Sequence, residues 1–206
     1  MITDGMIKEL REQISHLLSP HRYSHTLGVE RMAAFLASKC LPDKVSEARV
    51  AALLHDITKE FTAERHLKIL DENNVAPLDS DPFLSSALLH SQTAPFYVMD
   101  KFSRYATSEI LSAIEKHTTA DKDMSVLDKI IFLADFIEDT RPYPDSKLVS
   151  AFVMDAMISK DINENISVLD RACVMEIDST ISSLKERGRE VNSRTLLARD
   201  SLISKN

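Results

Sequence analysis

The chain has 206 residues, 44% of them hydrophobic and 28% charged, so it is long enough for one sizeable buried core. Its net charge of -7 argues against nucleic-acid and membrane-surface binding proteins, because a polyanion would be repelled overall. Only 3 glycines and no tryptophan occur, which favours an all-α fold over strand-rich folds and excludes glycine-rich phosphate loops.

Apolar residues recur at helical spacing along most of the chain. Ser19 and Pro20 provide the N-cap and first turn of one helix, and Ser125 opens another through a capping box with Asp128. Gly188 is a suitable C-cap for the long helix before it. Helices are therefore predicted at residues 3–18, 20–39, after 41–43 up to 55–56, 62–72, from 79–82 through 90, 107–116, 126–137, 146–159, 162–187 and 194–203.

The two cysteines, Cys40 and Cys173, are too few for a disulfide framework and are interpreted as reduced thiols of the core. No signal peptide is visible, and no apolar run approaches the ~20 residues that a membrane span needs. Repeats, low-complexity tracts and linkers are also absent from the sequence. We therefore expect a single domain in the cytoplasm.

Five polar points lie at the edges of apolar helical runs: His25, His55-Asp56, His90, His117 and Asp135. Four histidines and two aspartates suit a site for one or two transition-metal ions. Each has a simpler explanation by itself: His25 as a half-exposed helix residue, and His90 or His117 as a helix C-terminal residue favoured by the macrodipole. Asp135 is harder to explain, because an unpaired carboxylate on the most apolar helix would cost several kcal/mol.

The other histidines are weaker candidates for a site. His16 is expected at the surface, and His66, on an amphipathic helix, is expected to be solvated. His21 lies four residues before His25, but no HExxH pattern accompanies it, so it is expected at most to support a ligand.

The ordered set of His25, His55-Asp56, His90, His117 and Asp135 resembles the HD-domain superfamily of metal-dependent phosphohydrolases. Three stretches are similar to its YqeK branch of bacterial symmetrical diadenosine-tetraphosphate hydrolases: His21-Arg22-Tyr23-Ser24-His25-Thr26, His55-Asp56-Ile57-Thr58-Lys59, and Leu133-Ala134-Asp135-Phe136-Ile137-Glu138 followed by Arg141. The resemblance runs from about residue 15 to 145 and continues more faintly to Thr195. It implies a single HD-domain helical bundle over residues 1–206, with the metal site in a core at about 15–145 and the helices of about 146–206 packing on it.

The resemblance also implies the ligands of the metal. His25, His55, Asp56 and Asp135 would hold iron, and Asp56 could bridge to a second ion. His90 and His117 would face that second ion or the substrate phosphates directly. The resemblance leaves open whether one iron ion or two are bound, and manganese, cobalt or zinc could satisfy the same ligands.

The implied substrate is a small dinucleoside polyphosphate, cut symmetrically to two ADP, with neither nucleic acid nor a membrane as partner. Arg22, Lys59 and Arg141 would bind its phosphates. Asp56, His90 or His117 would orient or deprotonate the attacking water. Asn192, Arg194 and Thr195 would contact base or ribose, although the Tyr-Asn pair usual just after them is replaced by Arg199-Asp200.

Two alternative functions remain possible, and the protein could form a homodimer. The first alternative is another nucleotide phosphohydrolase on the same site, a nucleoside monophosphatase or a deoxynucleotide triphosphohydrolase. The second is a non-catalytic nucleotide-sensing module, which the full set of ligands disfavours.

Overall fold

The computed structural model describes residues 2–78, 82–159 and 161–204, with the backbone alone for 82–87. Its helices are α1 (Asp4–Ser15), α2 (Pro20–Cys40), α3 (Val45–Leu54), α4 (Ala63–Glu72), α5 (Pro82–Lys101), α6 (Ser108–Lys116), α7 (Val126–Ile137), α8 (Pro144–Ala156), α9 (Ile162–Glu186) and α10 (Ser193–Ser204). Two 3-10 turns, η1 (Pro42–Lys44) and η2 (Ser103–Tyr105), lie shortly before α3 and α6. No strand occurs in this part of the chain, and the expected all-α fold is confirmed.

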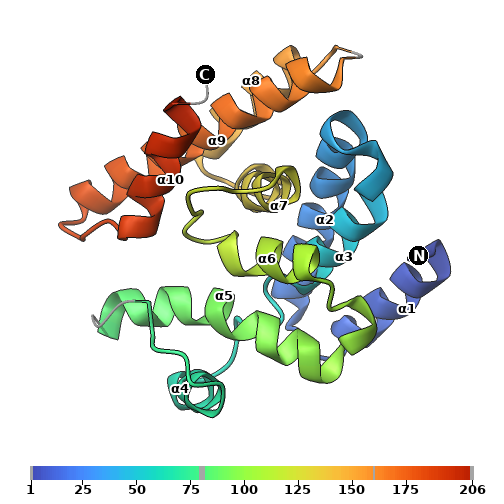
Figure 1. Cartoon of the computed structure of the whole chain (residues 1–206), viewed down its shortest axis with the longest axis vertical. Coiled ribbons are helices and arrows are strands. Elements are labelled where there is room, and N and C mark those ends of the chain that lie inside the picture. The colour runs from blue at the N-terminus through green and yellow to red at the C-terminus, as the bar shows by residue number, and fades with distance from the viewer. Residues whose placement is uncertain (1, 79–81, 160, 205–206) are drawn as a thin grey trace.

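Helix α7 is the centre of the fold. It packs against α2, α3, α6, α8 and α9, and Figure 1 shows it end-on with the other helices arranged around it. Its side chains are apolar on most sides because the helix is surrounded, and Leu133 and Ala134 are 0% exposed. Ser125 and Asp128 form the predicted capping box at its start. This central helix carries Asp135 to the middle of the molecule.

The ends of two helices agree with the sequence signals. Helix α2 begins with the predicted cap, in which Ser19 accepts a hydrogen bond from the backbone of Arg22. Gly188 follows α9 with φ +66°, the left-handed conformation that glycine adopts without strain. Helix α3 ends at Leu54 and His55 is its C-cap residue, so His55-Asp56 leaves the helix as predicted.

Helix α5 differs from the prediction because it continues past His90, through Pro95, to Lys101. His90 is therefore not a helix C-terminal residue. Buried apolar side chains on both sides of His90, such as Leu89 and Val98, hold this helix in place and override the break that a proline favours. The predicted helix start at Asp79, Ser80 and Asp81 lies outside the described residues.

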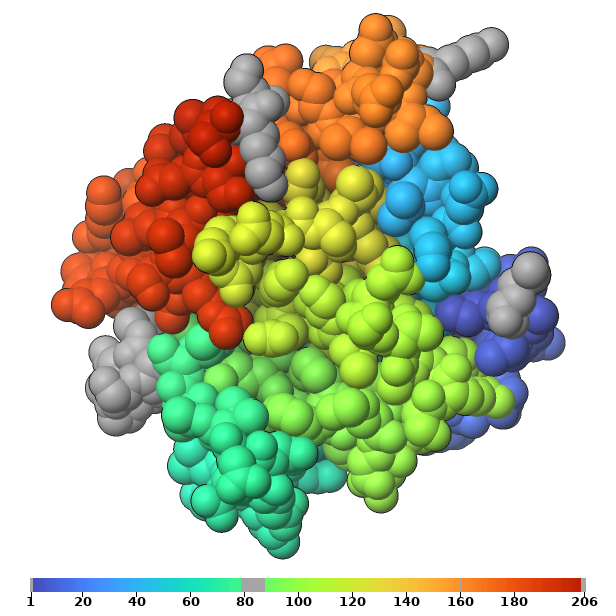
Figure 2. Space-filling model, viewed as in Figure 1, coloured from blue at the N-terminus to red at the C-terminus, as the bar shows by residue number. Residues whose placement is uncertain are grey.

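The C-terminal helices pack onto the helices that precede them. Helix α9 contacts both α7 and α2, and one hydrophobic cluster extends from Ile7 in α1 to Leu202 in α10. On the face shown in Figure 2, the red C-terminal segment lies against the yellow-green segment that joins α6 to α7. Cys40 and Cys173 are buried and free, as expected. None of the described helices has the length and hydropathy of a membrane span.

Candidate metal centre

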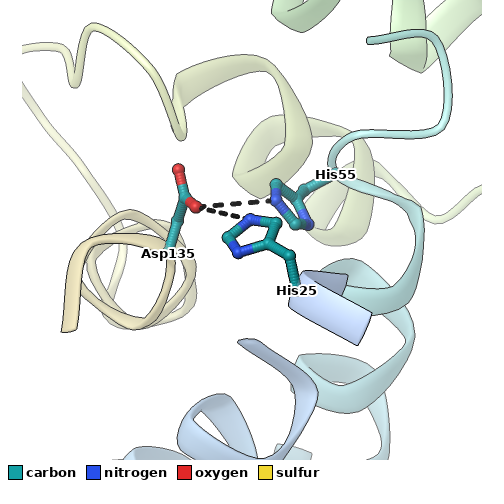
Figure 3. Close-up of side chains that lie close together, drawn as sticks. All are labelled: His25, His55 and Asp135. Carbon is teal, nitrogen blue, oxygen red and sulfur yellow. Dashed lines mark ion pairs between the residues drawn. The ribbon is translucent and has the colours of Figure 1, made fainter. Parts of the chain in front are cut away.

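Three helices bring the first group of candidate ligands together. His25 comes from the second turn of α2, His55 from the end of α3 and Asp135 from α7. Figure 3 shows both rings facing one carboxylate oxygen. Oδ1 of Asp135 lies 3.0 Å from Nε2 of His25 and 3.8 Å from Nε2 of His55. His55 is 0% exposed, whereas Asp135 is 22% exposed, so the group opens to solvent on the side of α7.

A second group shares His55 with the first. His55, Asp56 and His117 offer ligand atoms that all lie within 4.8 Å of one another. Asp56 lies between the two rings, with Oδ2 3.5 Å from Nε2 of His55 and Oδ1 3.6 Å from Nε2 of His117. His90 completes this side, because its Nε2 lies 3.2 Å from Asp56 Oδ1 and 3.0 Å from His117 Nε2.

Hydrogen bonds on the outer side of three rings fix which nitrogen points into the cluster. Nδ1 of His25 donates to Glu138 Oε1 at 3.0 Å, and Nδ1 of His55 and of His117 donate to the carbonyl oxygens of Ala52 and Ile114, each at 2.6 Å. A carboxylate and a carbonyl only accept, so the proton of each neutral ring is on Nδ1. The three Nε2 atoms therefore face inward with lone pairs, as metal-binding histidines do.

The donor set fits a cation. Among the residues that the structure describes, Nε2 of His25, Nε2 of His55 and Oδ1 of Asp56 are buried without a hydrogen-bond partner. At 3.0 Å, Nε2 of His25 and Oδ1 of Asp135 are two lone-pair atoms that face each other without an aligned hydrogen bond. Such an arrangement is costly unless a cation lies between the atoms. Mixed imidazole and carboxylate ligands suit a divalent transition metal.

Three cations line the open side of the cluster and are only partly exposed. Nη1 of Arg22 donates to Asp56 Oδ2 at 2.6 Å, Nζ of Lys59 lies 2.9 Å from His90 Nε2, and Arg141 pairs with the Asp135 carboxylate. Burial opposes ionisation of Asp56, but His55, His117, His90 and Lys59 together hold its pKa well below the usual range. The predicted phosphate-binding residues thus surround the predicted ligands, and their charges are available to an anion at the same place.

The pKa values of two of the histidines are shifted in opposite directions. Burial alone would lower the pKa of His25, but the adjacent carboxylates of Asp135 and Glu138 outweigh burial and raise it. Burial lowers the pKa of His90 well below its ordinary value, and the nearby Lys59 adds to this effect. His90 is therefore neutral at neutral pH and has a lone pair to accept a proton.

The three candidate nucleoside contacts lie at a different place, beside the segment that joins α6 to α7. Nη1 of Arg194 pairs with Glu115 at 3.0 Å, and the hydroxyl of Thr195 donates to the backbone of Thr119 at 2.8 Å. Oδ1 of Asn192 accepts from the Arg194 backbone. Arg194 and Glu115 line a cavity of about 250 Å³. The structure thus places these three residues next to the end of α6 and not within the cluster.

One prediction about the remaining histidines was wrong. His66 is 3% exposed and its Nδ1 lies 2.7 Å from the Thr93 hydroxyl, so it is buried between α4 and α5 and not solvated. His16 is exposed, as predicted, and His21, which was expected at most to support a ligand, is exposed too.

Two further residues escaped the sequence reasoning. Thr118 has its hydroxyl 3.1 Å from Nε2 of both His90 and His117, and no sequence signal pointed to it. Glu138 contacts His25. It is the last residue of the stretch from Leu133 to Glu138 that resembles the YqeK branch, and this resemblance was the sequence signal that could have identified it.

The comparisons with known proteins agree with this geometry. Residues 22–138 match the HD domain family. A symmetrical bis(5'-nucleosyl)-tetraphosphatase from Halalkalibacterium halodurans is 30% identical over 186 residues, which is 90% of this chain and 91% of the relative. A protein of the same name from Bacillus subtilis is 28% identical over 194 residues, 93% of this chain and 94% of the relative.

A solved structure shares the whole architecture. The crystal structure of an HD-superfamily hydrolase from Clostridium acetobutylicum, described as involved in NAD metabolism, superimposes with a TM-score of 0.81 at 27% identity and covers 100% of both chains. The matched family region includes His25, His55-Asp56, His117 and Asp135, the residues of the cluster. The chain therefore belongs to the HD-domain family, which implies that its cluster binds a divalent metal.

Proposed function

We propose that this protein is a symmetrical bis(5'-nucleosyl)-tetraphosphatase, which hydrolyses diadenosine tetraphosphate and related dinucleoside polyphosphates to two nucleoside diphosphates. The observation that carries the proposal is the cluster of inward-facing Nε2 atoms and carboxylates lined by Arg22, Lys59 and Arg141. The names of the Halalkalibacterium halodurans and Bacillus subtilis relatives, which match over most of this chain, support the same activity.

The polyphosphate is bound by side chains. The sequence has no glycine-rich loop, so the negative charge of the inner phosphates must be offset by the three cations of the site. Two of these cations are already bonded to carboxylates of the cluster, Arg22 to Asp56 and Arg141 to Asp135. When Asp56 and Asp135 hold a metal, the guanidinium groups of Arg22 and Arg141 would be free to turn toward the substrate phosphates.

The residues proposed to hold the metal are His25, His55, Asp56 and Asp135, with His117 and His90 beside a second ion. A bound divalent ion supplies Lewis-acid polarisation and makes water acidic enough to ionise near neutral pH. Iron is proposed from the family resemblance, and manganese, cobalt and zinc satisfy the same mixed ligands.

The protein's own groups position and move protons. His90 is neutral, because burial lowers its pKa, and its Nε2 lies within 3.2 Å of both Asp56 and the Thr118 hydroxyl. We assign to Asp56, His90 or His117 the orientation or deprotonation of the attacking water. A symmetrical cut releases a nucleoside diphosphate, which is a good leaving group and needs little protonation.

Four broader proposals accompany the activity. We keep Asn192, Arg194 and Thr195 as contacts to base or ribose, supported by the cavity beside Arg194. We take the chain as one domain, since one hydrophobic cluster includes side chains from α1 to α10. The cytoplasm is the proposed location, and a homodimer is a proposal that light scattering of the purified protein tests.

Chromatography of reaction products tests the activity. Purified protein loaded with iron or manganese is expected to convert diadenosine tetraphosphate to ADP as the only nucleotide product. Release of inorganic phosphate from a mononucleotide, or of triphosphate from a deoxynucleotide, without ADP from the dinucleotide would favour the other phosphohydrolases. Nucleotide binding without any hydrolysis in metal-loaded protein would favour the sensing module.

A further inference from the structure

Glu138 is a buried carboxylate that contacts the cluster from behind. Its side chain is 0% exposed, and Oε1 accepts from Nδ1 of His25 at 3.0 Å. The same carboxylate also accepts from the hydroxyl of Thr140 at 2.6 Å and from its backbone at 2.8 Å. Three hydrogen bonds therefore hold the Glu138 carboxylate in place as a fixed acceptor.

His25 needs a partner of this kind because of its position in a helix. His55 and His117 directly follow the last residues of α3 and α6, where backbone carbonyls lack partners within the helix, and each ring donates to the carbonyl three residues before it. His25 lies inside α2, where the backbone carbonyls accept from the next turn of the helix. Its outer nitrogen is therefore fixed by a side chain from the end of α7.

Gly28 provides the space that Glu138 occupies. It lies one turn after His25 on α2, and a Cβ atom at this position would be 2.3 Å from Glu138 Oε2 and 3.1 Å from Glu138 Cδ. The shorter distance is incompatible with a Cβ atom unless the buried carboxylate moves. A glycine inside a helix costs about 1 kcal/mol relative to alanine, so its presence here needs a reason. The close approach of Glu138 is that reason.

We propose that Glu138 is a positioning residue for the metal ligand His25, and that Gly28 is required only because it lets this carboxylate reach the ring. Glu138 keeps the proton on Nδ1, directs the Nε2 lone pair toward Asp135 and adds negative charge behind the ligand. The proposal rests on the metal-binding part of the proposed function and on no statement about the substrate.

Metal affinity tests the proposal without reference to hydrolysis. Calorimetric titration of metal-free protein with Mn²⁺ should show binding about 10- to 100-fold weaker in Glu138→Ala than in the native protein. The affinity of Glu138→Gln should lie between these two, because the amide oxygen can still accept from His25. Asp139→Asn is the matched control, since Asp139 is the next residue, exposed and paired with Arg31. It should bind Mn²⁺ like the native protein. Native affinity in Glu138→Ala would overturn the proposal.

A double-mutant cycle separates positioning from a general loss of packing. Gly28→Ala should weaken Mn²⁺ binding. The same change in the Glu138→Ala background should have little further effect, because only the 3.3 Å approach to Oδ1 of the exposed Asp139 then remains. Gly5→Ala is the control, since the nearest atom to its Cβ lies at an ordinary 3.8 Å. Equal losses from Gly28→Ala in both backgrounds would show that Gly28 does not act through Glu138.

A measurement on the native protein does not depend on any variant folding. Nitrogen-15 NMR of the metal-free protein, at a pH where His25 is neutral, should show its proton on Nδ1; a proton on Nε2 would overturn the proposal. If this tautomer and the Mn²⁺ series are as expected but no ADP forms, the proposed activity fails and the role of Glu138 stands.

Discussion

Arg22 and Asp56 form an ion pair with Nη1 2.6 Å from Oδ2, so a candidate phosphate ligand lies directly on a candidate metal ligand. The pair is mostly buried, with Arg22 22% and Asp56 3% exposed. A metal at Asp56 would compete with Arg22 for the carboxylate. Metal binding and phosphate binding are thus linked through one side chain.

The first prediction concerns Arg22. In Arg22→Met we expect KM for diadenosine tetraphosphate to rise by about 10- to 100-fold, since a charged hydrogen bond to phosphate contributes about 1.5–3 kcal/mol. Metal content should not fall, because the substitution removes a competitor for Asp56. Steady-state kinetics and elemental analysis measure both. Arg31→Met is the control on the same helix, since Arg31 is 59% exposed, and an equal effect there would show that only general charge matters.

The second prediction concerns the number of ions. His55 belongs to both ligand groups, whereas His117 belongs to one. Elemental analysis of protein saturated with Mn²⁺ should give two ions per chain for the native protein, one for His117→Ala and none for His55→Ala. His21→Ala, which alters an exposed histidine of α2, should keep two. One Mn²⁺ ion per chain in both the native protein and His117→Ala would show that the site binds a single ion.

Much of this site could be predicted from the sequence, because its ligands end apolar helical runs or interrupt them. His55 and Asp135 follow that rule, and the helix that contains Asp135 begins at a capping box that the sequence also predicts. Glu138 could not be assigned in this way. Its partner His25 is 113 residues away, and only the packing of α7 on α2 shows that they touch.

His66 and His90 show the opposite difficulty. His66 lies on a helix with exposed polar residues around it, and its burial depends on contact with Thr93 of α5, a helix that the sequence placed only as far as His90. His90 was open to interpretation as a helix C-terminal residue, but α5 continues past it to Lys101. In both cases tertiary packing overrides a local signal, and such packing is not encoded within a short window of sequence.

The third prediction follows from the buried state of His66. Burial lowers the pKa of His66 from 6.5 to about 4, so the unfolded chain binds a proton that the folded chain does not between these values. Stability should therefore be lost as pH falls from 6.5 toward 4, by up to about 3 kcal/mol from this group. Urea unfolding of metal-free protein at several pH values measures the slope.

His66→Gln is the variant that isolates this effect, because glutamine can keep a hydrogen bond to Thr93. In this pH range the variant should take up about one proton fewer on unfolding, so its free energy of unfolding should depend less steeply on pH. His16→Gln, at the exposed C-cap position of α1, is the matched histidine-to-glutamine control for the effect of the substitution on overall stability. An unchanged slope in His66→Gln would mean that His66 is not titrated by unfolding.

The last prediction concerns Arg194, whose charge is already compensated. Nη1 lies 3.0 Å from Glu115 and Nε lies 3.6 Å from Asp121, so Arg194 is a poor ligand for phosphate and is better suited to contact a neutral nucleoside. Arg194→Met should raise KM for diadenosine tetraphosphate by about 3- to 10-fold, corresponding to about 1 kcal/mol for one hydrogen bond. It should leave Mn²⁺ affinity unchanged, unlike the Glu138 variants.

Arg199→Met provides the comparison for Arg194. Arg199 lies on the same helix α10, where it replaces a residue of the usual Tyr-Asn pair, and it is bonded to Asp178 of α9. This contact belongs to the packing of α10 on α9, so the substitution should lower thermal stability slightly and leave KM unchanged. If Arg199→Met raised KM as much as Arg194→Met, the nucleoside would depend on the position of α10 as a whole and not on the Arg194 side chain.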